Sequence, residues 1–332
     1  MPELPEVETV RQGLAALVTG ARISRVEIRR DSCVRLLPGG AAEFAALVEG
    51  ARLARLVRRG KFLWAELSED DAGAGAGAVD DAGSVDDAPR ASAPPVLALS
   101  AHLGMSGQFR VHDAVGREAP EPHRHCRARL TLAEPDLTLD FLDQRTFGYL
   151  HAEPLVATPD GGPGGLGTSM PVLPASVAHI GRDALDPALD LVAASRALRR
   201  GTRGIKQVLL DQTVVSGIGN IYADEALWLA RVHPERPARA VTASSARTLL
   251  EAVREVMGRA LAQGGTSFDA LYVNVNGESG YFSRSLEAYG RAGEPCSRCG
   301  SALRRETIGG RSTHWCARCQ RRWAARREGQ RS

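Results

Sequence analysis

The spacing of apolar residues first predicts a helix near the start of the chain. Val7, Val10, Leu14 and Leu17 recur every three or four residues, which places them on one face of a helix. Acidic residues occupy the first turn, where the helix dipole favours negative charge, and Pro5 suits a first helical position. We therefore expect a helix that begins almost at the N-terminus.

Short apolar runs bounded by turn residues then predict strands in the first half of the chain. They cover residues 22–29, 52–58, 61–67, 96–103, 128–133 and 137–142. The last two runs flank Glu134-Pro135-Asp136, which indicates a hairpin. This pattern predicts a β-rich N-terminal domain, which we expect to be a sandwich.

The second half of the chain shows helical spacing instead. A Gly/Pro-rich stretch from Thr158 to Pro171 marks the boundary, and the helices are expected near residues 187–200, 204–211, 220–231 and 242–263. Residues 204–225 indicate a helix, a glycine turn and a second helix. Asn220 is a candidate N-cap there, and backbone N–H groups beside Gly219 offer an anion site. Such turns are common between helices, so this feature alone does not define a function.

Charge is distributed unevenly along a chain whose net charge is only +3. Residues 281–332 hold twelve Arg and four Glu, a local charge of +8, which suggests a polyanionic partner. Residues 66–95 hold eight acids and one Arg, a local charge of −7. The Gly/Ala/Asp composition of residues 68–95 predicts a disordered surface insert.

No run approaches the roughly 18 apolar residues of a membrane helix, and the acidic N-terminus does not resemble a secretory signal, so we expect a cytoplasmic protein.

Four of the six cysteines are arranged as two Cys-x-x-Cys pairs separated by sixteen residues. This is zinc-ribbon spacing, and it predicts one structural zinc ion. Two disulfides are the alternative, which a cytoplasmic location disfavours. A basic ribbon that folds around a metal is more often a nucleic-acid-binding module than a purely structural one, and Arg311 follows the glycines of the expected hairpin tip. The ligands are Cys296, Cys299, Cys316 and Cys319.

Two features at the amino-acid level suggest amine chemistry. Of 42 basic residues only Lys61 and Lys206 are lysine, the basic side chain that exchanges protons when its pKa is lowered. Pro2 becomes a secondary amine if Met1 is removed, beside the Glu3 carboxylate. Such an amine can attack an aldehyde-like carbon and form an iminium. The alternative for the scarcity of lysine is codon bias, and the alternative for the Met1-Pro2 start is that proline simply stiffens the beginning of the chain.

Five motifs, in this order along the chain, resemble the formamidopyrimidine-DNA glycosylase family. The resemblance spans nearly the whole chain apart from the inserts at 68–95 and 158–171, and the ordered set is more specific than any single motif. The motifs are Pro2-Glu3-Leu4-Pro5-Glu6-Val7-Glu8, His102-Leu103-Gly104-Met105-Ser106-Gly107, Asp143-Gln144-Arg145-Thr146-Phe147-Gly148, the glycine turn through Asn220, and the four-cysteine ribbon.

The resemblance implies a bifunctional enzyme that excises oxidised purines such as 8-oxoguanine from duplex DNA and cleaves the strand by β,δ-elimination. Pro2 would be the nucleophile at the deoxyribose C1′ and Glu3 the general acid/base. Lys61 matches the lysine that assists elimination, and Arg311 is also implicated in δ-elimination. Glu6 would help shape the lesion pocket, although an acid in a first helical turn also has a structural reason.

The resemblance also implies contacts that hold the DNA. Met105, Arg145 and Phe147 would enter the duplex and fill the space left by a flipped nucleotide. Phosphate contacts would come from His123, Lys206, Asn220 and Arg311. The run His123-Arg124-His125-Cys126 has metal binding as a minor alternative. The loop from Gly264 to Tyr281 resembles the family's lesion-capping loop.

The expected fold class is α+β, with a β-sandwich domain flanked by helices, a helix-two-turns-helix domain and a zinc hairpin, and DNA between the halves. We expect a catalytic domain at 1–157, a linker at 158–175, a helical domain at 176–288, a zinc finger at 289–325 and a tail at 326–332. The partner would be double-stranded DNA with oxidised bases or abasic sites, bound by a monomer in the bacterial cytoplasm, at the nucleoid and not at a membrane.

Two departures from the family pattern carry expectations of their own. Thr146 stands where many members have a second basic residue, which puts one backbone contact in doubt, and the acidic insert would repel DNA if it lay near the groove.

Two rival functions remain. One is an endonuclease VIII type enzyme for oxidised pyrimidines, which Leu4 and Met105 disfavour, and the other is a non-catalytic zinc-ribbon DNA-binding protein that retains Met1.

Overall fold

The computed structural model describes residues 2–68, 97–113, 121–265 and 285–323 of the chain. They form two compact units: unit 1 combines residues 1–13, 58–62 and 179–332, and unit 2 combines residues 14–57 and 63–178. The expected acidic insert lies almost entirely outside the described residues, and so does most of the expected loop from Gly264 to Tyr281.

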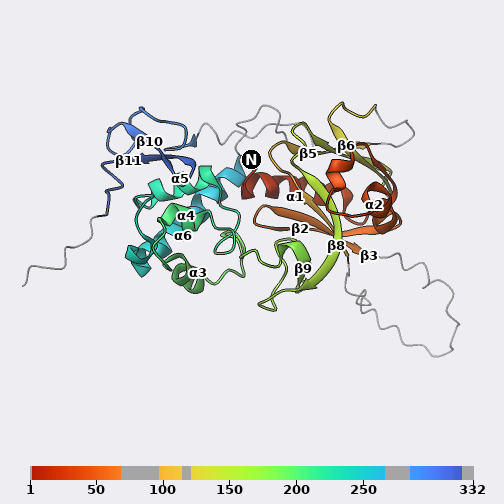
Figure 1. The fold of residues 1–332 in the computed structure, drawn as a ribbon, viewed down its shortest axis with the longest axis horizontal. Coiled ribbons are helices and arrows are strands. Elements are labelled where there is room, and N and C mark those ends of the chain that lie inside the picture. The colour runs from red at the N-terminus through yellow and green to blue at the C-terminus, as the bar shows by residue number, and fades with distance from the viewer. Residues whose placement is uncertain (1, 69–96, 114–120, 266–284, 324–332) are drawn as a thin grey trace, which may run out of the picture. The chain divides into compact units, whose positions relative to one another are not determined.

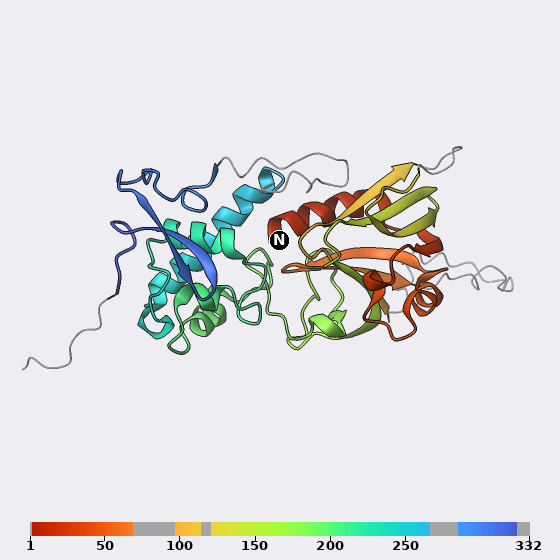
Figure 2. The ribbon, with the colours of Figure 1, turned by 45° about the horizontal axis from the view of Figure 1, so that its top comes forward.

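The N-terminal helix forms as the apolar spacing predicts. Helix α1 (Leu4–Val18) carries Glu6 in its first turn and begins at the N-terminal label in Figure 2. Val7, Val10 and Leu14 are buried, but Leu17 is 39% exposed, so its assignment to the buried face was wrong. The buried stripe continues through Val18 because position 18, four residues after Leu14, lies directly above it on the helix.

Unit 2 is built on one nine-stranded sheet with the order β5-β7-β6-β1-β2-β3-β4-β8-β9. The predicted hairpin around Glu134-Pro135-Asp136 is confirmed, since β6 and β7 pair antiparallel on either side of it. The strands are β1 (Arg22–Ile28), β2 (Arg52–Arg59), β3 (Phe62–Ser68), β4 (Leu97–His102), β5 (Gly107–Asp113), β6 (Cys126–Ala133), β7 (Leu137–Asp143), β8 (Tyr149–Ala157) and β9 (Val172–Pro174).

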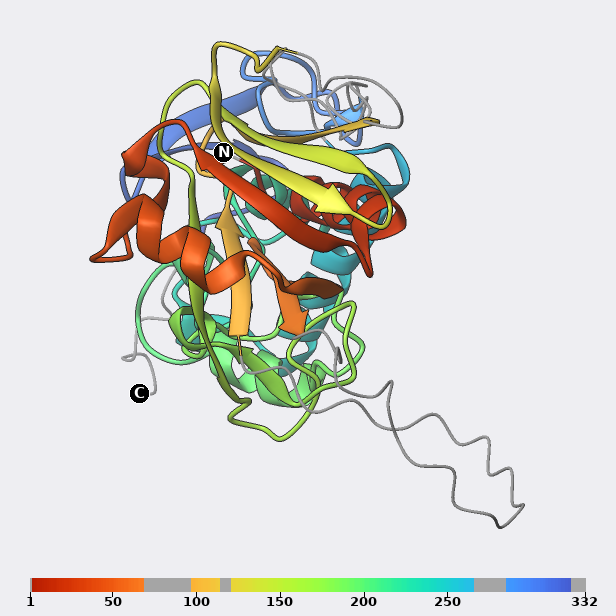
Figure 3. The same ribbon diagram turned by 90° about the vertical axis from the view of Figure 1, so that its right-hand side faces the viewer.

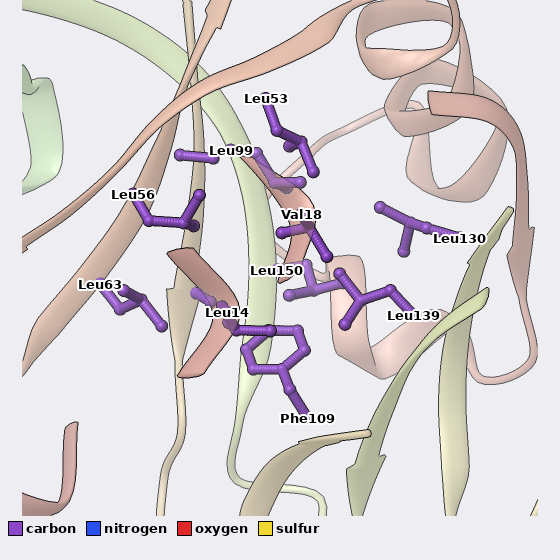
Figure 4. Close-up of a pocket in the computed structure, with 12 residues that line it drawn as sticks. Leu14, Val18, Leu53, Leu56, Leu63, Leu99, Phe109, Leu130, Leu139 and Leu150 are labelled. Carbon is purple, nitrogen blue, oxygen red and sulfur yellow. The ribbon is translucent and has the colours of Figure 1, made fainter. Parts of the chain in front are cut away.

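This sheet folds into a sandwich because very few backbone pairs join its two halves. Strands β1 and β2 share a single Cα pair, Arg22 with Arg52, and in Figure 3 the strand groups on either side of this joint cross at a large angle. Both groups and α1 contribute side chains to one apolar interior (Figure 4), which leaves a cavity of about 30 Å³. A cavity of that size lined only by apolar side chains offers water no polar partner, so it belongs to the core.

Four elements of unit 2 were not predicted. They are α2 (Gly40–Val48), β5, β8 and β9. Strand β8 contains Pro154, and a proline inside an apolar run weakens the strand signal. Short 3-10 turns also occur at Asp31–Val34, Ala175–Val177 and Ala238–Ala240.

Unit 1 contains the predicted helices in shorter form. They are α3 (Leu191–Leu198), α4 (Ile205–Leu209), α5 (Asn220–Leu229) and α6 (Ala243–Ala262), packed around one hydrophobic core (Figure 1). Helix α3 starts four residues later than predicted because the Asp190 side chain accepts the N–H groups of Val192 and Ala193 and so caps it. Thr242 caps α6 in the same way.

The chain's last described segment is a two-stranded hairpin in unit 1. Strand β10 (Leu303–Ile308) pairs antiparallel with β11 (Arg311–Cys316), and Figure 2 shows the hairpin as a twisted ribbon in blue. The turn is Gly309-Gly310, both with positive φ. Over the part of the chain that is described, no helix is both long and apolar enough to cross a bilayer.

Candidate active site

Glu3 lies at the N-terminus of α5. Its carboxylate accepts the backbone N–H of Ile221 at 3.0 Å and that of Tyr222 at 3.4 Å. These are among the first N–H groups of the helix, which have no partner within it. The predicted anion site beside Gly219 therefore exists, and in this structure the anion is the chain's own Glu3.

The expectation that Asn220 caps α5 was wrong. The N-cap is Gly219, and Asn220 is the first helical residue. A Cβ atom at position 219 would fall on the carboxyl group of Glu3, so a side chain there would displace the acid. The Asn220 side chain instead donates to the carbonyl oxygen of Ser312 at 2.8 Å, which ties α5 to the zinc hairpin.

Burial sets the acidity of Glu3. The residue is 4% exposed, and desolvation raises its pKa from an ordinary 4.5 to about 7, with the Lys61 ammonium opposing and the Glu6 carboxylate adding to this rise. Glu6 accepts the Glu3 N–H at 2.9 Å and the Tyr222 hydroxyl at 2.8 Å. Both forms of the Glu3 carboxyl are therefore populated near neutral pH, as general acid/base catalysis requires.

Lys61 lies on the turn between β2 and β3, in unit 1 with Glu3. Its ammonium donates to the carbonyl oxygen of Ile218 at 3.0 Å, and burial lowers its pKa although Glu3 partly offsets this. Gly60 precedes it with φ +59°, and a Cβ atom there would collide with Ser216 and Gly217. This close approach brings the lysine turn to the loop that precedes α5.

A buried ion cluster that sequence reasoning missed supports this turn. The Arg58 guanidinium, fully buried, contacts the Glu8 and Asp183 carboxylates at 2.8 Å each. Asp183 also accepts the Gly60 N–H at 2.9 Å. The cluster therefore connects α1, the Lys61 turn and the segment after residue 179, and only the long-range pairing of three ordinary-looking charged residues reveals it.

Lys206 is placed differently from what its expected role in DNA binding suggested. Its side chain is 1% exposed, and its ammonium lies 2.6 Å from the Asp224 carboxylate and donates to Ser312 O and Thr313 Oγ1. Burial lowers its pKa while Asp224 opposes this. In this structure the ammonium connects α4, α5 and the hairpin, and its contact with phosphate stays a prediction.

Asp224 is a second residue that sequence reasoning missed. Its carboxylate also accepts the backbone N–H of His314 at 2.8 Å. The signal was available, because Asp224 and Glu225 are adjacent acids inside an otherwise apolar helix. Buried acids in such a position need partners, which here lie in the hairpin and the segment before it.

Arg311 begins β11 and is exposed. Gly309 in the same turn packs closely on Gln207, since a Cβ atom there would lie 2.7 Å from the Gln207 amide nitrogen. The hairpin tip therefore rests on α4 and presents the Arg311 guanidinium to solvent.

The four ribbon cysteines form one cluster at the base of the hairpin. Their sulfur atoms all lie within 4.8 Å of one another, and none of the described cysteines is in a disulfide. Zinc–sulfur bonds of about 2.3 Å in a tetrahedron place sulfurs about 3.8 Å apart, so the arrangement suits one zinc ion. This is also the one group of three or more potential ligands among the described residues, and His123, His125 and Cys126 form no such group there.

The three expected wedge residues gather in unit 2. Met105 is 39% exposed and Phe147 57%, high values for large apolar side chains. The Arg145 guanidinium lies 3.8 Å from the Met105 sulfur. The two loops touch closely, because a Cβ atom at Gly104 would collide with the backbone of Phe147 and Gly148.

A buried carboxylate holds these two loops together. Asp143 accepts the Ser106 hydroxyl at 2.5 Å and the Gly148 N–H at 2.7 Å, and the Arg145 N–H at 3.2 Å. The exposed side chains of Met105 and Phe147 are therefore carried on a fixed base. Exposed apolar side chains on a rigid support are suited to insertion into another molecule.

His123 and Thr146 also lie in unit 2. His123 is exposed, and its Nδ1 accepts the His125 N–H at 3.2 Å. Thr146, the departure from the family pattern, has φ 57°, a left-handed conformation that is rare for a β-branched residue. The phosphate contact expected of His123 stays a prediction.

Comparison with known proteins identifies three regions of the chain. Residues 1–150 match the formamidopyrimidine-DNA glycosylase N-terminal domain. Residues 180–270 match the H2TH domain of the same enzyme, and residues 293–322 match a zinc finger found in FPG and IleRS. The matched regions include Pro2, Glu3, Asn220 and all four cysteines.

Curated relatives align over almost the entire chain. The formamidopyrimidine-DNA glycosylase of Leifsonia xyli is 49% identical over 97% of this chain and 100% of its own length. That of Thermobifida fusca is also 49% identical, over 97% of this chain and 98% of its own. Neither the endonuclease VIII type nor a non-catalytic binding protein is favoured by these matches.

Solved structures agree with the sequence matches. The crystal structure of MutM (Fpg) from Thermus thermophilus has 35% identity and a TM-score of 0.71, covering 96% of this chain and 98% of that one. The Lactococcus lactis Fpg in complex with DNA containing an abasic site has 28% identity and a TM-score of 0.71, covering 96% and 100%. With its sheet domain, H2TH helices and four-cysteine zinc site, the chain belongs to the formamidopyrimidine-DNA glycosylase family.

Proposed function

We propose that this enzyme excises oxidised purines, 8-oxoguanine and formamidopyrimidines, from duplex DNA and then cleaves the strand at the abasic site by β,δ-elimination. The observation that carries the proposal is the Glu3 carboxyl, which is buried at the N-terminus of α5 beside Pro2 and has a pKa of about 7. Relatives named for the same activity, and their complexes with abasic-site and Fapy-dG DNA, support the substrate class.

The nucleophile is Pro2 after removal of Met1. Its nitrogen attacks C1′ of the lesion nucleotide, the C1′–N bond breaks, and the base leaves with the electron pair and takes up the nitrogen's proton. The nitrogen lone pair then opens the C1′–O4′ bond to give an iminium, and O4′ receives the proton that Glu3 holds. A carboxyl that is half protonated near neutral pH is matched to this transfer.

Strand cleavage follows from the iminium. Loss of a C2′ proton breaks the C3′–O bond and releases one phosphate, and loss of a C4′ proton then breaks the C5′–O bond and releases the other. Water hydrolyses the iminium and frees Pro2. The Lys61 amine, whose pKa burial lowers, assists these proton transfers, and Arg311 at the hairpin tip stabilises a departing phosphate.

The remaining expected residues hold the DNA. Asn220, His123 and Lys206 contact phosphates, Glu6 shapes the lesion pocket, and Met105, Arg145 and Phe147 fill the space left by the flipped nucleotide. The zinc ion, bound by the four cysteines, supplies folding free energy to the hairpin and takes no part in proton transfer. The enzyme acts as a monomer on nucleoid DNA in the bacterial cytoplasm.

Borohydride trapping tests this mechanism. Reduction of the iminium on an abasic-site duplex should give a stable covalent complex, and peptide mapping should locate the adduct at Pro2. Intact mass should show that Met1 is absent. An adduct at Lys61 or Lys206, or a mature chain that keeps Met1, would exclude Pro2 as the nucleophile.

A further inference from the structure

Arg298 lies between two zinc ligands, in Cys296-Ser297-Arg298-Cys299, yet its side chain points to a helix. Its guanidinium donates to the carbonyl oxygens of Trp228 at 2.8 Å and Leu229 at 3.2 Å. Both carbonyls belong to the last turn of α5. The last carbonyl groups of a helix lack N–H partners within the helix. A cation at this end donates hydrogen bonds to them and interacts favourably with the helix dipole.

Trp228 completes a closed set of contacts at the same place. The guanidinium carbon of Arg298 lies 3.6 Å from the centre of the Trp228 ring, and the Trp228 indole N–H donates to the Cys296 sulfur at 3.4 Å. Trp228 is 5% exposed. One side chain of α5 thus contacts a metal ligand directly, and the residue between the ligands binds α5 in return.

The opposite end of the same helix holds Glu3, through the N–H groups of Ile221 and Tyr222. Helix α5 has ten residues and is therefore only about 15 Å long. An element this short moves as a rigid body, so the position of its last turn determines where its first N–H groups lie.

Most other groups around Glu3 come from different elements, and Tyr222 belongs to α5 itself. Lys61 and Glu6 face its carboxyl, Tyr222 donates to Glu6, and Lys206 interacts with Glu3 electrostatically. None of these residues contacts Arg298 in the part of the chain that is described. A change made at Arg298 therefore reaches Glu3 through the helix.

We propose that Arg298 is a positioning residue that couples zinc binding to the acid–base chemistry of Glu3, by clamping the C-terminal turn of α5 once the Cys296–Cys299 knuckle has closed on the metal. The proposal rests on the proposed role of Glu3. It assigns the zinc finger a second task, which is to set the helix that presents hydrogen-bond donors to the catalytic carboxyl.

The chain offers a matched control in the second knuckle. Arg318 occupies the same position in Cys316-Ala317-Arg318-Cys319, but it is exposed, and among the described residues its side chain reaches only the Cys299 carbonyl, at 3.5 Å. Arg298→Ala and Arg318→Ala therefore remove the same charge at the same sequence position between two metal ligands, and only the first removes the clamp on α5.

The first measurement is the pH dependence of single-turnover base excision by the zinc-loaded proteins. The Ile221 and Tyr222 hydrogen bonds lower the pKa of Glu3, so their loosening in Arg298→Ala should raise the pKa that governs the rate, by about 0.5 or more. Arg318→Ala should keep the wild-type value, and Arg298→Lys, which can still donate to the carbonyls, should recover part of the change.

The second measurement is the rate of zinc release to a chelator, followed with a colorimetric zinc indicator. Arg298→Ala and Trp228→Phe should each release zinc several-fold faster than Arg318→Ala, because they open the contacts around Cys296. Trp315→Phe is the control for the indole, since the buried Trp315 side-chain N–H has no hydrogen-bond partner among the described residues.

Two results overturn the proposal. One is a wild-type pH profile in Arg298→Ala, and the other is a zinc release rate equal to that of Arg318→Ala. If Arg298→Ala does not fold, Trp228→Phe replaces it in both measurements, because it removes the indole that contacts both Arg298 and Cys296. Borohydride trapping of the wild-type protein at Pro2 is independent of both results, so failure of the coupling leaves the proposed function standing, and failure of trapping refutes that function by itself.

Discussion

Glu3 and Ile221 are 218 residues apart in the sequence, and the Glu3 carboxylate accepts the Ile221 N–H at 3.0 Å. A helix N-terminus is usually capped by a side chain of its own first turn. Here the capping group comes from the other end of the chain, and the helix dipole acts on an acid proposed to do the chemistry.

Gly219→Ala tests how closely the carboxyl approaches the helix. The new Cβ atom would fall on the Glu3 carboxyl group, so we expect a loss of about 1–3 kcal/mol in the free energy of unfolding and a large fall in excision rate. Gly258→Ala is the control, because nothing lies within 4 Å of its Cβ position in α6, and it should stabilise the protein by about 0.5–1 kcal/mol. Urea unfolding and single-turnover rates measure both, and equal effects of the two variants would contradict the close approach.

Glu3→Gln tests the raised pKa through stability. The native pKa of about 7 exceeds the ordinary 4.5, so the native state binds this proton more tightly than the unfolded state. The free energy of unfolding of the wild type should therefore fall relative to Glu3→Gln as pH rises from about 4.5 to 7, by about 3 kcal/mol in total, and stay level above pH 7. Glu251→Gln, at an exposed position of α6, should show no such trend, and a flat difference for Glu3→Gln as well would mean that burial does not perturb Glu3.

Phe147→Ala tests the wedge. Loss of an apolar contact worth about 2 kcal/mol should slow base excision from a paired duplex by on the order of thirtyfold. Cleavage at an existing abasic site should change little, because that site has already lost the stacking. Leu36→Ala removes another exposed apolar side chain of the same unit, 45% exposed, and should affect neither rate. Equal slowing of both reactions by Phe147→Ala would mean that Phe147 supports the fold.

Arg58→Met tests the buried ion cluster. It leaves the Asp183 carboxylate buried without its cation and the Glu8 carboxylate with Arg11 alone, which should lower the free energy of unfolding by about 3–5 kcal/mol. Arg25→Met removes a cation whose side chain is 70% exposed, and should cost less than about 1 kcal/mol. Similar urea midpoints for the two variants would show that the cluster contributes little.

Local patterns in the sequence were sufficient to predict the family, the α+β fold class and the zinc ligands. The cysteine spacing identifies Cys296, Cys299, Cys316 and Cys319 because the ligands of a ribbon lie near one another in sequence. The helices around the core of unit 1 follow from apolar spacing in the same way. The information for the zinc ligands and for each helix is local, whereas the family follows from the order of five such local motifs along the chain.

Long-range pairing accounts for what the sequence did not reveal. Asn220 was a reasonable cap by local rules, and the acid that replaces it comes from position 3. The rarity of lysine suggested chemistry at Lys206, but its partner Asp224 lies on the next helix. Arg58, Glu8 and Asp183 are ordinary charged residues until the fold brings them together.

Unit 1 is assembled from three separate stretches of chain, 1–13, 58–62 and 179–332, and this has a consequence during synthesis. Pro2 and Glu3 leave the ribosome early, but Ile221, which holds Glu3, is made 218 residues after Glu3. At 5–20 residues per second that interval lasts on the order of 10 to 40 seconds. A nascent or prematurely terminated chain therefore carries the proposed Pro2 nucleophile without the helix that would complete the site, so such fragments should not nick the chromosome.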